Sequence, residues 1–407
     1  MVVSRLALDH FRSWDHCLLD LTPGVTILQG ANGLGKTNIV EALEVLATGS
    51  SHRATSSLPL VQRGHTQATI RANVSDKPDE PPITIEATIR AKGANRARIN
   101  GGSSRYMRDI AGMIPLVAFT PDDQRLVAGD PGARRQFMNQ TASMLMRGYA
   151  DQLQRFTHVA KQRAALLKQL GAAERGFDAY RDTALTGLEI WTGQYIELGL
   201  QITRARIDLV ERLQRPFADL VARLSGAGEQ ASLLYEPSFA EVLDGDDPAA
   251  RISQHFQRLY AGEVARGQNL IGPQRDELVV QLNGMPAREF ASNGEMWTLG
   301  LALKMAVYEL LNQEYGTQPV VILDDVFAQL DETRRAQILA FAQAQRQVII
   351  TVAAASDIPP IAGAHVIDVH DLRAAWNTGR THDPRTSGGG APPRRTQTRR
   401  AGVQTPE

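Results

Sequence analysis

The stretch Val25-Thr-Ile-Leu28-Gln-Gly30-Ala-Asn-Gly-Leu-Gly35-Lys36-Thr37 decides the fold of this chain. It opens with a compact apolar strand signal, and its second half matches the phosphate-binding pattern GxxxxGK[ST]. Apolar residues then recur at helical spacing over residues 36–47. A strand, a glycine-rich turn and a helix in this order predict a phosphate-binding loop inside an α/β domain.

Every residue type in this turn has a chemical reason to be there. The glycines allow consecutive backbone N–H groups and the start of the helix to face phosphate oxygens. Lys36 would neutralise the β and γ phosphates, and the Thr37 hydroxyl would complete a Mg²⁺ shell. The flanking strand and helix favour this interpretation over a mere glycine-rich turn. The predicted phosphate-binding residues are Gly30, Ala31, Asn32, Gly33, Leu34, Gly35, Lys36, Thr37 and Asn38.

A second strand ends in two carboxylates. Val320-Val-Ile-Leu323 is an apolar run typical of a buried parallel strand, and Asp324 and Asp325 follow it directly. On its own this pair would be interpreted as two exposed carboxylates at a strand end. With the phosphate-binding turn upstream, Asp324 is expected to bind Mg²⁺, and Asp325 to orient or deprotonate the attacking water. Lys36, Asp324 and Asp325 are therefore the predicted catalytic residues.

Two further segments stay open to two interpretations each. Ser292-Asn-Gly294-Glu295 lies at the start of a helix predicted from Glu295 to Leu311. This segment is either a capping box or a second phosphate-binding helix end, which would meet a nucleotide held by another subunit. Ala328-Gln-Leu-Asp331 is either a helix cap or a subunit contact.

The hydrophobic pattern predicts an α/β head that is split by a helical insert. Residues 1–130 and 263–371 carry strand and helix signals in turn, whereas residues 131–262 follow mostly helical spacing, and Pro216 is expected to interrupt the second helix of this insert. Residues 372–407 contain seven arginines against two acids, with runs of glycine and proline. This composition predicts a disordered basic tail, either a solvated end or a weak phosphate-binding segment.

Composition excludes several classes of protein. The chain has 407 residues, 43% of them apolar, which is enough for folded cores, and a single cysteine, Cys17, which excludes an intramolecular disulfide framework and a Cys-rich metal site. The 44 basic and 44 acidic residues balance, so any polyanion site must be a local patch. Neither a signal peptide nor an 18-residue apolar run is present, and we expect a soluble cytoplasmic protein with no membrane partner.

The order of the motifs resembles that of the RecF family of bacterial DNA replication and repair proteins, whose ABC-type ATPase heads are related to those of SMC proteins. The resemblance covers almost the whole chain up to about residue 370. The segments that carry it are His10-Phe11-Arg12, residues 30–38 with Glu41-Ala42, Phe119-Thr-Pro-Asp-Asp123, Gly129-Asp-Pro131 with Arg134-Arg135-Gln-Phe137, Gly272-Pro273 with Arg275-Asp276, and Leu323-Asp-Asp-Val326. It implies an α/β fold: an ABC-type P-loop NTPase head with mixed β-sheets, split by an inserted helical arm.

The resemblance also implies the ligands and partners. They are ATP with Mg²⁺, and a head-to-tail homodimer in which Ser292 and Gly294 contact the γ phosphate held by Lys36 of the other subunit. Weak, DNA-stimulated ATP hydrolysis would release this dimer. Further implied properties are sequence-independent binding of double-stranded DNA and single/double-strand junctions at gaps, cooperation with RecR and RecO, loading of RecA, support of the SOS response, and a nucleoid-associated location.

Three positions depart from the pattern of the family or of related ATPases. Glu295 stands where an amide is usual, which would place a negative charge beside the γ phosphate unless the side chain turns away. The segment Thr351-Val-Ala-Ala-Ala355 offers only the Thr351 hydroxyl where ABC enzymes place a polar switch residue. Asp325 replaces the glutamate of transporter ATPases and is one methylene shorter, which predicts slow turnover.

Two other functions compete with an ATP-gated mediator. In the first, the chain is a DNA-binding and protein-docking module in which ATP is only a structural ligand. In the second, it is the cytoplasmic subunit of an ABC transporter, which the long helical insert disfavours. For the DNA contact itself, aromatic residues make up only 6% of the chain, so backbone contacts are expected rather than base stacking. His52 and Arg53 could approach nucleotide or DNA, although a solvated loop is the simpler interpretation.

Overall fold

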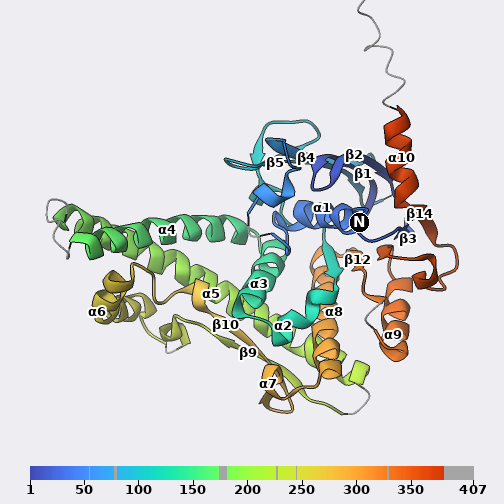
Figure 1. Ribbon diagram of the computed structural model, residues 1–407. Coiled ribbons are helices and arrows are strands. Elements are labelled where there is room, and N and C mark those ends of the chain that lie inside the picture. The colour runs from blue at the N-terminus through green and yellow to red at the C-terminus, as the bar shows by residue number, and fades with distance from the viewer. Residues whose placement is uncertain are drawn as a thin grey trace, which may run out of the picture.

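The computed structural model describes residues 1–54, 56–77, 80–173, 181–225, 228–243, 245–327 and 330–379. Figure 1 shows a head built around α1, with a long helical arm that projects to one side. Ala328, Gln329 and residues 380–407, which include most of the predicted tail, lie outside the described residues. Across the described ranges, no helix is both long and apolar enough to cross a membrane.

A five-stranded parallel sheet forms the centre of the head. Its strands lie in the order β14-β3-β13-β12-β8, and every residue of β12 and β13 is buried. Such strands are apolar on both faces because helices cover both sides. The strands are β3 (Gly24–Gln29), β8 (Leu116–Phe119), β12 (Val320–Asp324), β13 (Gln347–Val352) and β14 (His365–Asp368).

The two faces of this sheet belong to different cores. Leu28, Ile322 and Ile349 pack with helix α1 (Lys36–Thr48), whereas Ile27, Leu323 and Ile350 pack with α8 (Asn293–Tyr315). Alternate residues of each strand therefore point to opposite layers, as the period of a strand requires.

A six-stranded antiparallel sheet packs into the α1 core. Its order is β2-β1-β4-β5-β6-β7. In the described part of the chain each sheet is purely parallel or purely antiparallel. The head therefore combines parallel and antiparallel sheets, but no single sheet contains both strand directions. The strands are β1 (Val2–Phe11), β2 (Trp14–Asp20), β4 (Gln67–Ser75), β5 (Ile83–Arg90), β6 (Arg96–Ile99) and β7 (Arg105–Tyr106).

The arm contains four helices: α3 (Pro131–Leu145), α4 (Tyr149–Ala173), α5 (Arg181–Ser225) and α6 (Pro248–Arg266). The predicted interruption at Pro216 is wrong, because α5 continues through this residue. Leu213 and Phe217 are fully buried on either side of it, and their burial offsets the roughly 3 kcal/mol cost of a proline in a helix.

A small antiparallel sheet, β11-β10-β9, crosses the predicted boundary between insert and head. Strand β9 (Ala231–Glu236) comes from the insert and pairs with β10 (Glu277–Leu282), which turns into β11 (Met285–Pro286) at Asn283-Gly284. The insert is thus not entirely helical. Hydrogen bonds along β9 and β10 tie it to the second half of the head.

The remaining elements are short or follow the sheet edges. Helix α10 (Val369–Gly379) continues beyond Leu372, where the tail was predicted to begin, and stands beside β2 and β14 (Figure 1). The other helices are α2 (Arg125–Ala128), α7 (Ala287–Phe290) and α9 (Glu332–Gln343), and the 3₁₀ turns are η1 (Leu58–Leu60), η2 (Met107–Asp109), η3 (Pro121–Gln124), η5 (Ala240–Leu243), η6 (Pro273–Arg275) and η8 (Ala355–Asp357).

Candidate functional site

The glycine-rich turn joins β3 to α1 in the conformation that its glycines allow. Gly33 and Gly35 have φ angles of 85° and 95°, in the left-handed region that favours glycine. A Cβ atom on Gly35 would also lie only 2.7 Å from Ser13 Oγ. Lys36 Nζ donates to the carbonyl oxygens of Gly30 (2.6 Å) and Ala31 (3.2 Å), so its ammonium group folds over the loop.

The two carboxylates at the end of β12 lie directly beside this loop. Asp324 is 6% exposed, and its Oδ1 accepts hydrogen bonds from the hydroxyls of Thr37 (3.1 Å) and Thr351 (2.6 Å). Burial raises the pKa of the Asp324 carboxyl, although both hydroxyls oppose this shift. The parallel pairing of β12 and β13 places Thr351 opposite Asp324. Thr37, Asp324 and Thr351 thus form one polar cluster.

Asp325 begins the turn after β12 with a φ of 55°, a conformation that aspartate tolerates better than most residues. Its N–H donates to Thr351 Oγ1 (3.0 Å) and to the Thr351 carbonyl (3.3 Å). Thr351 therefore contacts both carboxylate residues, and it occupies the place where a polar switch residue was expected.

These groups fit the hard cation that a nucleotide site requires. Mg²⁺ prefers oxygen ligands, and a buried carboxylate beside a threonine hydroxyl is such a donor set. Asp324 and Thr37 would hold the ion, which would neutralise charge on the β and γ phosphates.

A second polar cluster surrounds Glu41 of α1 and is completed by Arg12, which follows β1, and by Ser51 and Arg53, which follow α1. Arg12 donates to both oxygens of the buried Glu41 carboxylate, at 2.9 Å and 2.5 Å, and the Ser51 hydroxyl donates to the same group at 2.5 Å. Arg53 reaches Glu41 (3.2 Å) and Asn38 Oδ1 (3.3 Å). Arg53 is exposed, as expected of a solvated loop, and it also lies beside the phosphate-binding turn, as the alternative interpretation required.

His52, which follows α1, is held against this helix by Glu44. The Glu44 carboxylate lies 2.6 Å from His52 Nδ1 and accepts from the His52 N–H at 3.0 Å. Burial lowers the pKa of His52, but the hydrogen bond and the charge of Glu44 outweigh burial and leave it raised. Glu44 also accepts from Gln140 of α3 (2.9 Å), which joins α1 to the arm.

The segment before α8 adopts the capping box. Ser292 Oγ accepts from the Glu295 N–H (3.3 Å), and Glu295 Oε2 accepts from the Ser292 N–H (2.6 Å). Hydrogen bonds from the backbone N–H and the side chain of Ser292 lower the pKa of the Glu295 carboxyl. The Glu295 carboxylate thus turns back onto its own helix start, and the Arg334 guanidinium lies where a side chain on Gly294 would extend.

One copy of the chain does not bring this segment to the phosphate-binding loop. In Figure 1 the start of α8 lies beside α7 at the lower edge of the molecule, whereas α1 lies in its upper half. The structure therefore brings together Lys36, Thr37, Asp324 and Asp325, and leaves Ser292 and Gly294 apart from them. Asp331 caps α9 by accepting from the Arg334 N–H at 2.9 Å. Of the two interpretations of the segment that ends at Asp331, the helix cap is therefore the one that this residue adopts.

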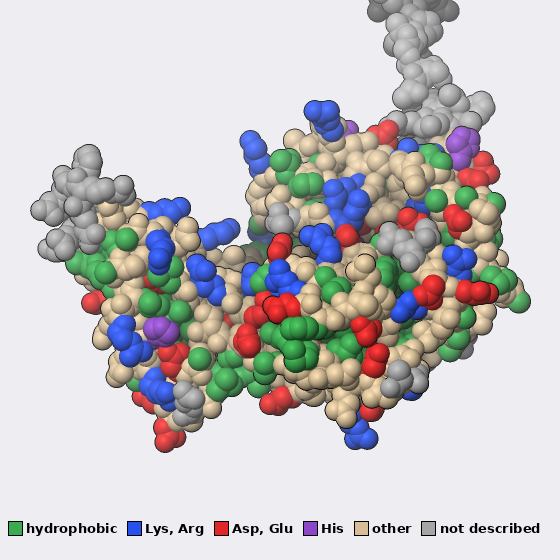
Figure 2. Space-filling view, turned by 60° about the horizontal axis from the view of Figure 1, so that its bottom comes forward, with side chains coloured by type: hydrophobic (Ala, Val, Ile, Leu, Met, Phe, Trp, Pro, Cys, Tyr) green, Lys and Arg blue, Asp and Glu red, His purple; other side chains and the backbone are tan. Residues whose placement is uncertain are grey.

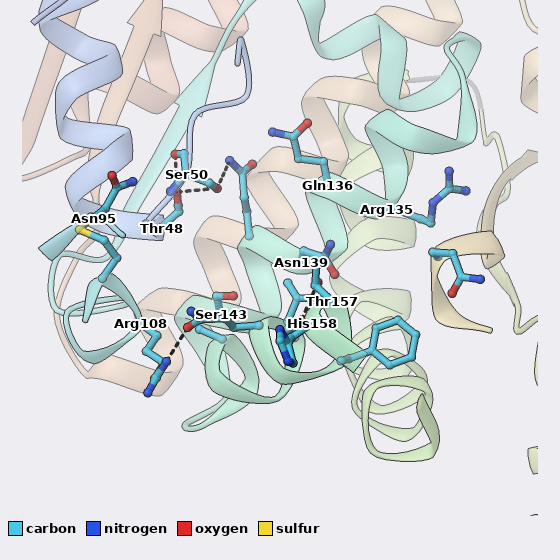
Figure 3. Close-up of a pocket in the computed structure, with 18 of the residues that line it drawn as sticks. Thr48, Ser50, Asn95, Arg108, Arg135, Gln136, Asn139, Ser143, Thr157 and His158 are labelled. Atoms are coloured by element: carbon cyan, nitrogen blue, oxygen red, sulfur yellow. Dashed lines mark hydrogen bonds between the residues drawn. The ribbon is translucent and has the colours of Figure 1, made fainter. Parts of the chain in front are cut away.

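A cleft of about 920 Å³ lies between the end of α1 and the arm helices α3 and α4 (Figure 3). Its charged lining residues are all basic: Arg108, Arg135, Lys161 and Arg206. Arg206 is neutralised by Asp276 at 2.7 Å, and Arg108 by Asp151 at 2.9 Å. Lysine and arginine side chains also line both sides of the notch between arm and head in Figure 2. Sequence reasoning missed this cleft because its residues are far apart along the chain.

Residues 2–359 match the family described as RecF/RecN/SMC N terminal domain. The DNA replication and repair protein RecF of Bifidobacterium adolescentis is 65% identical over 375 residues, which cover 92% of this chain and 92% of that protein. RecF of Bifidobacterium longum subsp. infantis is 62% identical over 372 residues, 91% of this chain and 90% of that protein. RecF of Streptomyces avermitilis is 39% identical over 363 residues, 89% and 96% of the two chains.

Two solved structures share the fold. One is described as the recombination mediator protein RecF-ATP in the RecFOR pathway, with a TM-score of 0.75, 25% identity, and coverage of 88% of this chain and 93% of that chain. The other, described as RecF-ATPrS in the same pathway, has a TM-score of 0.77 at 24% identity and covers 90% and 97%.

Proposed function

Because this chain belongs to the RecF family of DNA replication and repair proteins and has its ABC-type ATPase head, we propose that it is an ATP-dependent, DNA-binding recombination mediator. ATP and Mg²⁺ would bind at the phosphate-binding turn. Two copies would pair head to tail on ATP, and slow hydrolysis would release them.

A single observation carries the ATPase part of this proposal. Lys36 and Thr37 at the start of α1 lie with Asp324 and Asp325 at the end of β12, and Thr351 contacts both carboxylate residues. Hydrolysis needs an ordered water in line with the γ phosphate, and Asp325 is the carboxylate residue that directly follows the buried Asp324. Asp325 would orient or deprotonate that water, and its short side chain supports slow turnover.

The separation of Ser292 and Gly294 from the loop supports the proposed homodimer. If these residues contact a γ phosphate, a second copy must hold it. The Glu295 carboxylate accepts from the Ser292 N–H, which is the orientation toward its own helix start that the sequence left open.

The basic cleft between arm and head supports the proposed DNA contact. Lys161 and Arg135 line it, and no carboxylate is among its lining residues in the described chain. Phosphates would contact such a surface without base readout, so binding should be independent of sequence. We propose double-stranded DNA and single/double-strand gap junctions as the substrates. By family membership we further propose cooperation with RecR and RecO, RecA loading, support of the SOS response, and action at the nucleoid in the cytoplasm.

The test is the mass of the protein in solution with Mg²⁺ and no nucleotide, ADP or ATP, with a labelled gapped duplex added in parallel. Wild type should dimerise only with ATP, and DNA binding should follow the dimer. Lys36→Ala and Ser292→Arg should stay monomeric in ATP, whereas Ser103→Arg, which changes an exposed serine elsewhere, should behave as wild type. A monomer in every state that still binds DNA would refute the ATP gate and favour the module with a structural nucleotide.

A further inference from the structure

Helix α10 lies against the first end of the phosphate-binding turn and reaches the second end through Ser13 and Trp14. At the first end, Val369 is fully buried. Its Cβ lies so close to Gly30 that a Cβ atom on this glycine would be only 3.5 Å away. At the second end, Arg373 Nη2 donates to the carbonyl oxygen and the hydroxyl of Ser13, both at 3.0 Å. Its guanidinium also lies 4.6 Å from the centre of the Trp14 ring.

Ser13 and Trp14 in turn contact the end of the turn and the start of α1. Trp14 Nε1 donates to the Gly35 carbonyl at 3.0 Å, and Asn38 Nδ2 donates to Ser13 Oγ at 2.9 Å. A Cβ atom on Gly35 would lie 2.8 Å from Trp14 Nε1, so the two segments touch with no room between them. The β1–β2 hairpin therefore holds the last glycine of the turn in place.

We propose that Arg373 is a positioning residue of the nucleotide site, which acts through Ser13 and Trp14 to hold Gly35 and the first turn of α1 in the shape that binds phosphate. The proposal rests on the proposed function, because it needs ATP at this loop. Arg373 does not contact the phosphates itself.

The geometry of the contact explains why an arginine serves here. A planar guanidinium can stack on an indole ring and donate hydrogen bonds from its edge at the same time, which an ammonium group cannot do. No ion pair in the described part of the chain includes Arg373, so its bonds to Ser13 do not compete with a carboxylate. Loss of the guanidinium would leave the hairpin free to move away from Gly35.

The proposal separates binding from chemistry. Asp324, Asp325 and Thr351 lie at the ends of β12 and β13, whereas the side-chain contacts of Arg373 in the described chain are with Ser13 and Trp14, so the hydrolytic step should not depend on Arg373. An ordered loop lowers the cost of binding, because less conformational freedom is lost when the ligand arrives. Arg373 should therefore affect the affinity for ATP and leave the rate at saturation unchanged.

The experiment measures MgATP binding to the full chain by calorimetry, and hydrolysis as a function of ATP concentration. Arg373→Ala should weaken MgATP about tenfold through the lost stack and hydrogen bonds, raise KM by a similar factor, and change kcat by less than about twofold. Arg373→Lys should bind with intermediate affinity. Arg5→Ala, at the opposite end of the same hairpin, removes an exposed arginine paired with Asp20 and should bind as wild type.

A double-mutant cycle distinguishes positioning from general stability. Because Arg373 acts through Trp14, its loss should add little to the weakened binding of Trp14→Phe, which cannot donate to Gly35. A chain that ends at Gly379 keeps α10 and should retain wild-type affinity. Additive losses in the cycle, or wild-type affinity of Arg373→Ala, would overturn the proposal while leaving the proposed function standing. Lys36→Ala should not bind MgATP. If the wild type also fails to bind it, both the role of Arg373 and the proposed function would be overturned.

Discussion

Thr351 is the side chain that organises the end of the central sheet. Its hydroxyl donates to Asp324 and accepts from the Asp325 N–H, so one residue fixes a buried carboxylate and the turn that follows it. Valine would keep the shape of this side chain but remove both bonds, so that Asp324 would keep only the Thr37 hydroxyl and the Asp325 N–H only the carbonyl of residue 351. The local geometry of the carboxylates therefore depends on a strand that follows them in the sequence.

The first prediction concerns Asp325→Asn. The amide has nearly the same size but cannot take a proton from water, so hydrolysis should fall by about 10²-fold or more while ATP still binds. If hydrolysis times release, the lifetime of the protein on a gapped duplex in ATP should lengthen accordingly. Fluorescence measurements of dissociation would show this, with Asp246→Asn, an exposed aspartate, as the control. An unchanged lifetime with hydrolysis abolished would mean that ATP is a structural ligand.

The second prediction concerns pH and His52. Because the folded protein raises the pKa of His52 above its ordinary value of 6.5, this group stabilises the fold below that pH, and the contribution disappears as pH rises through the folded pKa. His52→Gln should thus cost more unfolding free energy at about pH 6 than at about pH 9. Urea denaturation at both pH values measures this difference. An equal cost at both would show that the Glu44 contact does not favour the charged imidazole.

At the scale of elements, buried ion pairs join the arm to the head. Arg206 of α5 donates to Asp276 at 2.7 Å and to the Pro273 carbonyl at 2.6 Å, and Tyr235 and the Ser238 N–H also bind Asp276. Burial raises the pKa of the Asp276 carboxyl, with Arg206 opposing this shift. The pair fixes α5 against the turn that precedes β10.

The third prediction follows from this pair. Arg206→Met should destabilise the protein by about 3–5 kcal/mol, because it leaves a buried carboxylate without its partner. Arg212→Met removes an exposed pair with Glu314 and should cost at most about 1 kcal/mol. Chemical denaturation compares the two. If Arg206→Met lowers the free energy of unfolding as little as Arg212→Met does, the buried pair is not needed to hold the arm.

The sequence was informative where an element carries its own pattern. The strand, turn and helix of residues 25–47 and the strand before Asp324 were predicted correctly, because apolar period and glycine spacing are local signals. Helix α5 and strand β9 were not, because only tertiary packing decides that Pro216 stays helical and that residues 231–236 pair with β10. The contacts of Arg373 with Ser13 and Trp14 have no local signal, because they join residues from opposite ends of the chain.

At the scale of the whole molecule, charge is balanced overall but not locally. The chain has no formal net charge, while the cleft between arm and head has only basic charged residues in its lining. A polyanion would therefore be attracted to this cleft although the chain as a whole has no net charge.

The fourth prediction tests this cleft with salt. Affinity for a gapped duplex should fall steeply with salt, and the Arg135→Ala, Lys161→Ala double variant should reduce the slope of log K against log salt by about two. Lys77→Ala, which removes an exposed lysine paired with Glu80, should leave the slope unchanged. Wild-type slopes in the double variant would place the DNA elsewhere.

The position of β3 has a consequence for how the protein is made. This strand leads into the phosphate-binding turn, yet its two neighbours in the sheet are β13 and β14, near the other end of the chain. At about 5–20 residues per second, a ribosome needs some tens of seconds between synthesis of the turn and synthesis of those neighbours. The nucleotide site is thus encoded early and assembled late. A nascent chain that lacks β13 and β14 leaves both edges of β3 unpaired, so the strand that leads into the phosphate-binding turn gains its neighbours only when the chain is nearly finished.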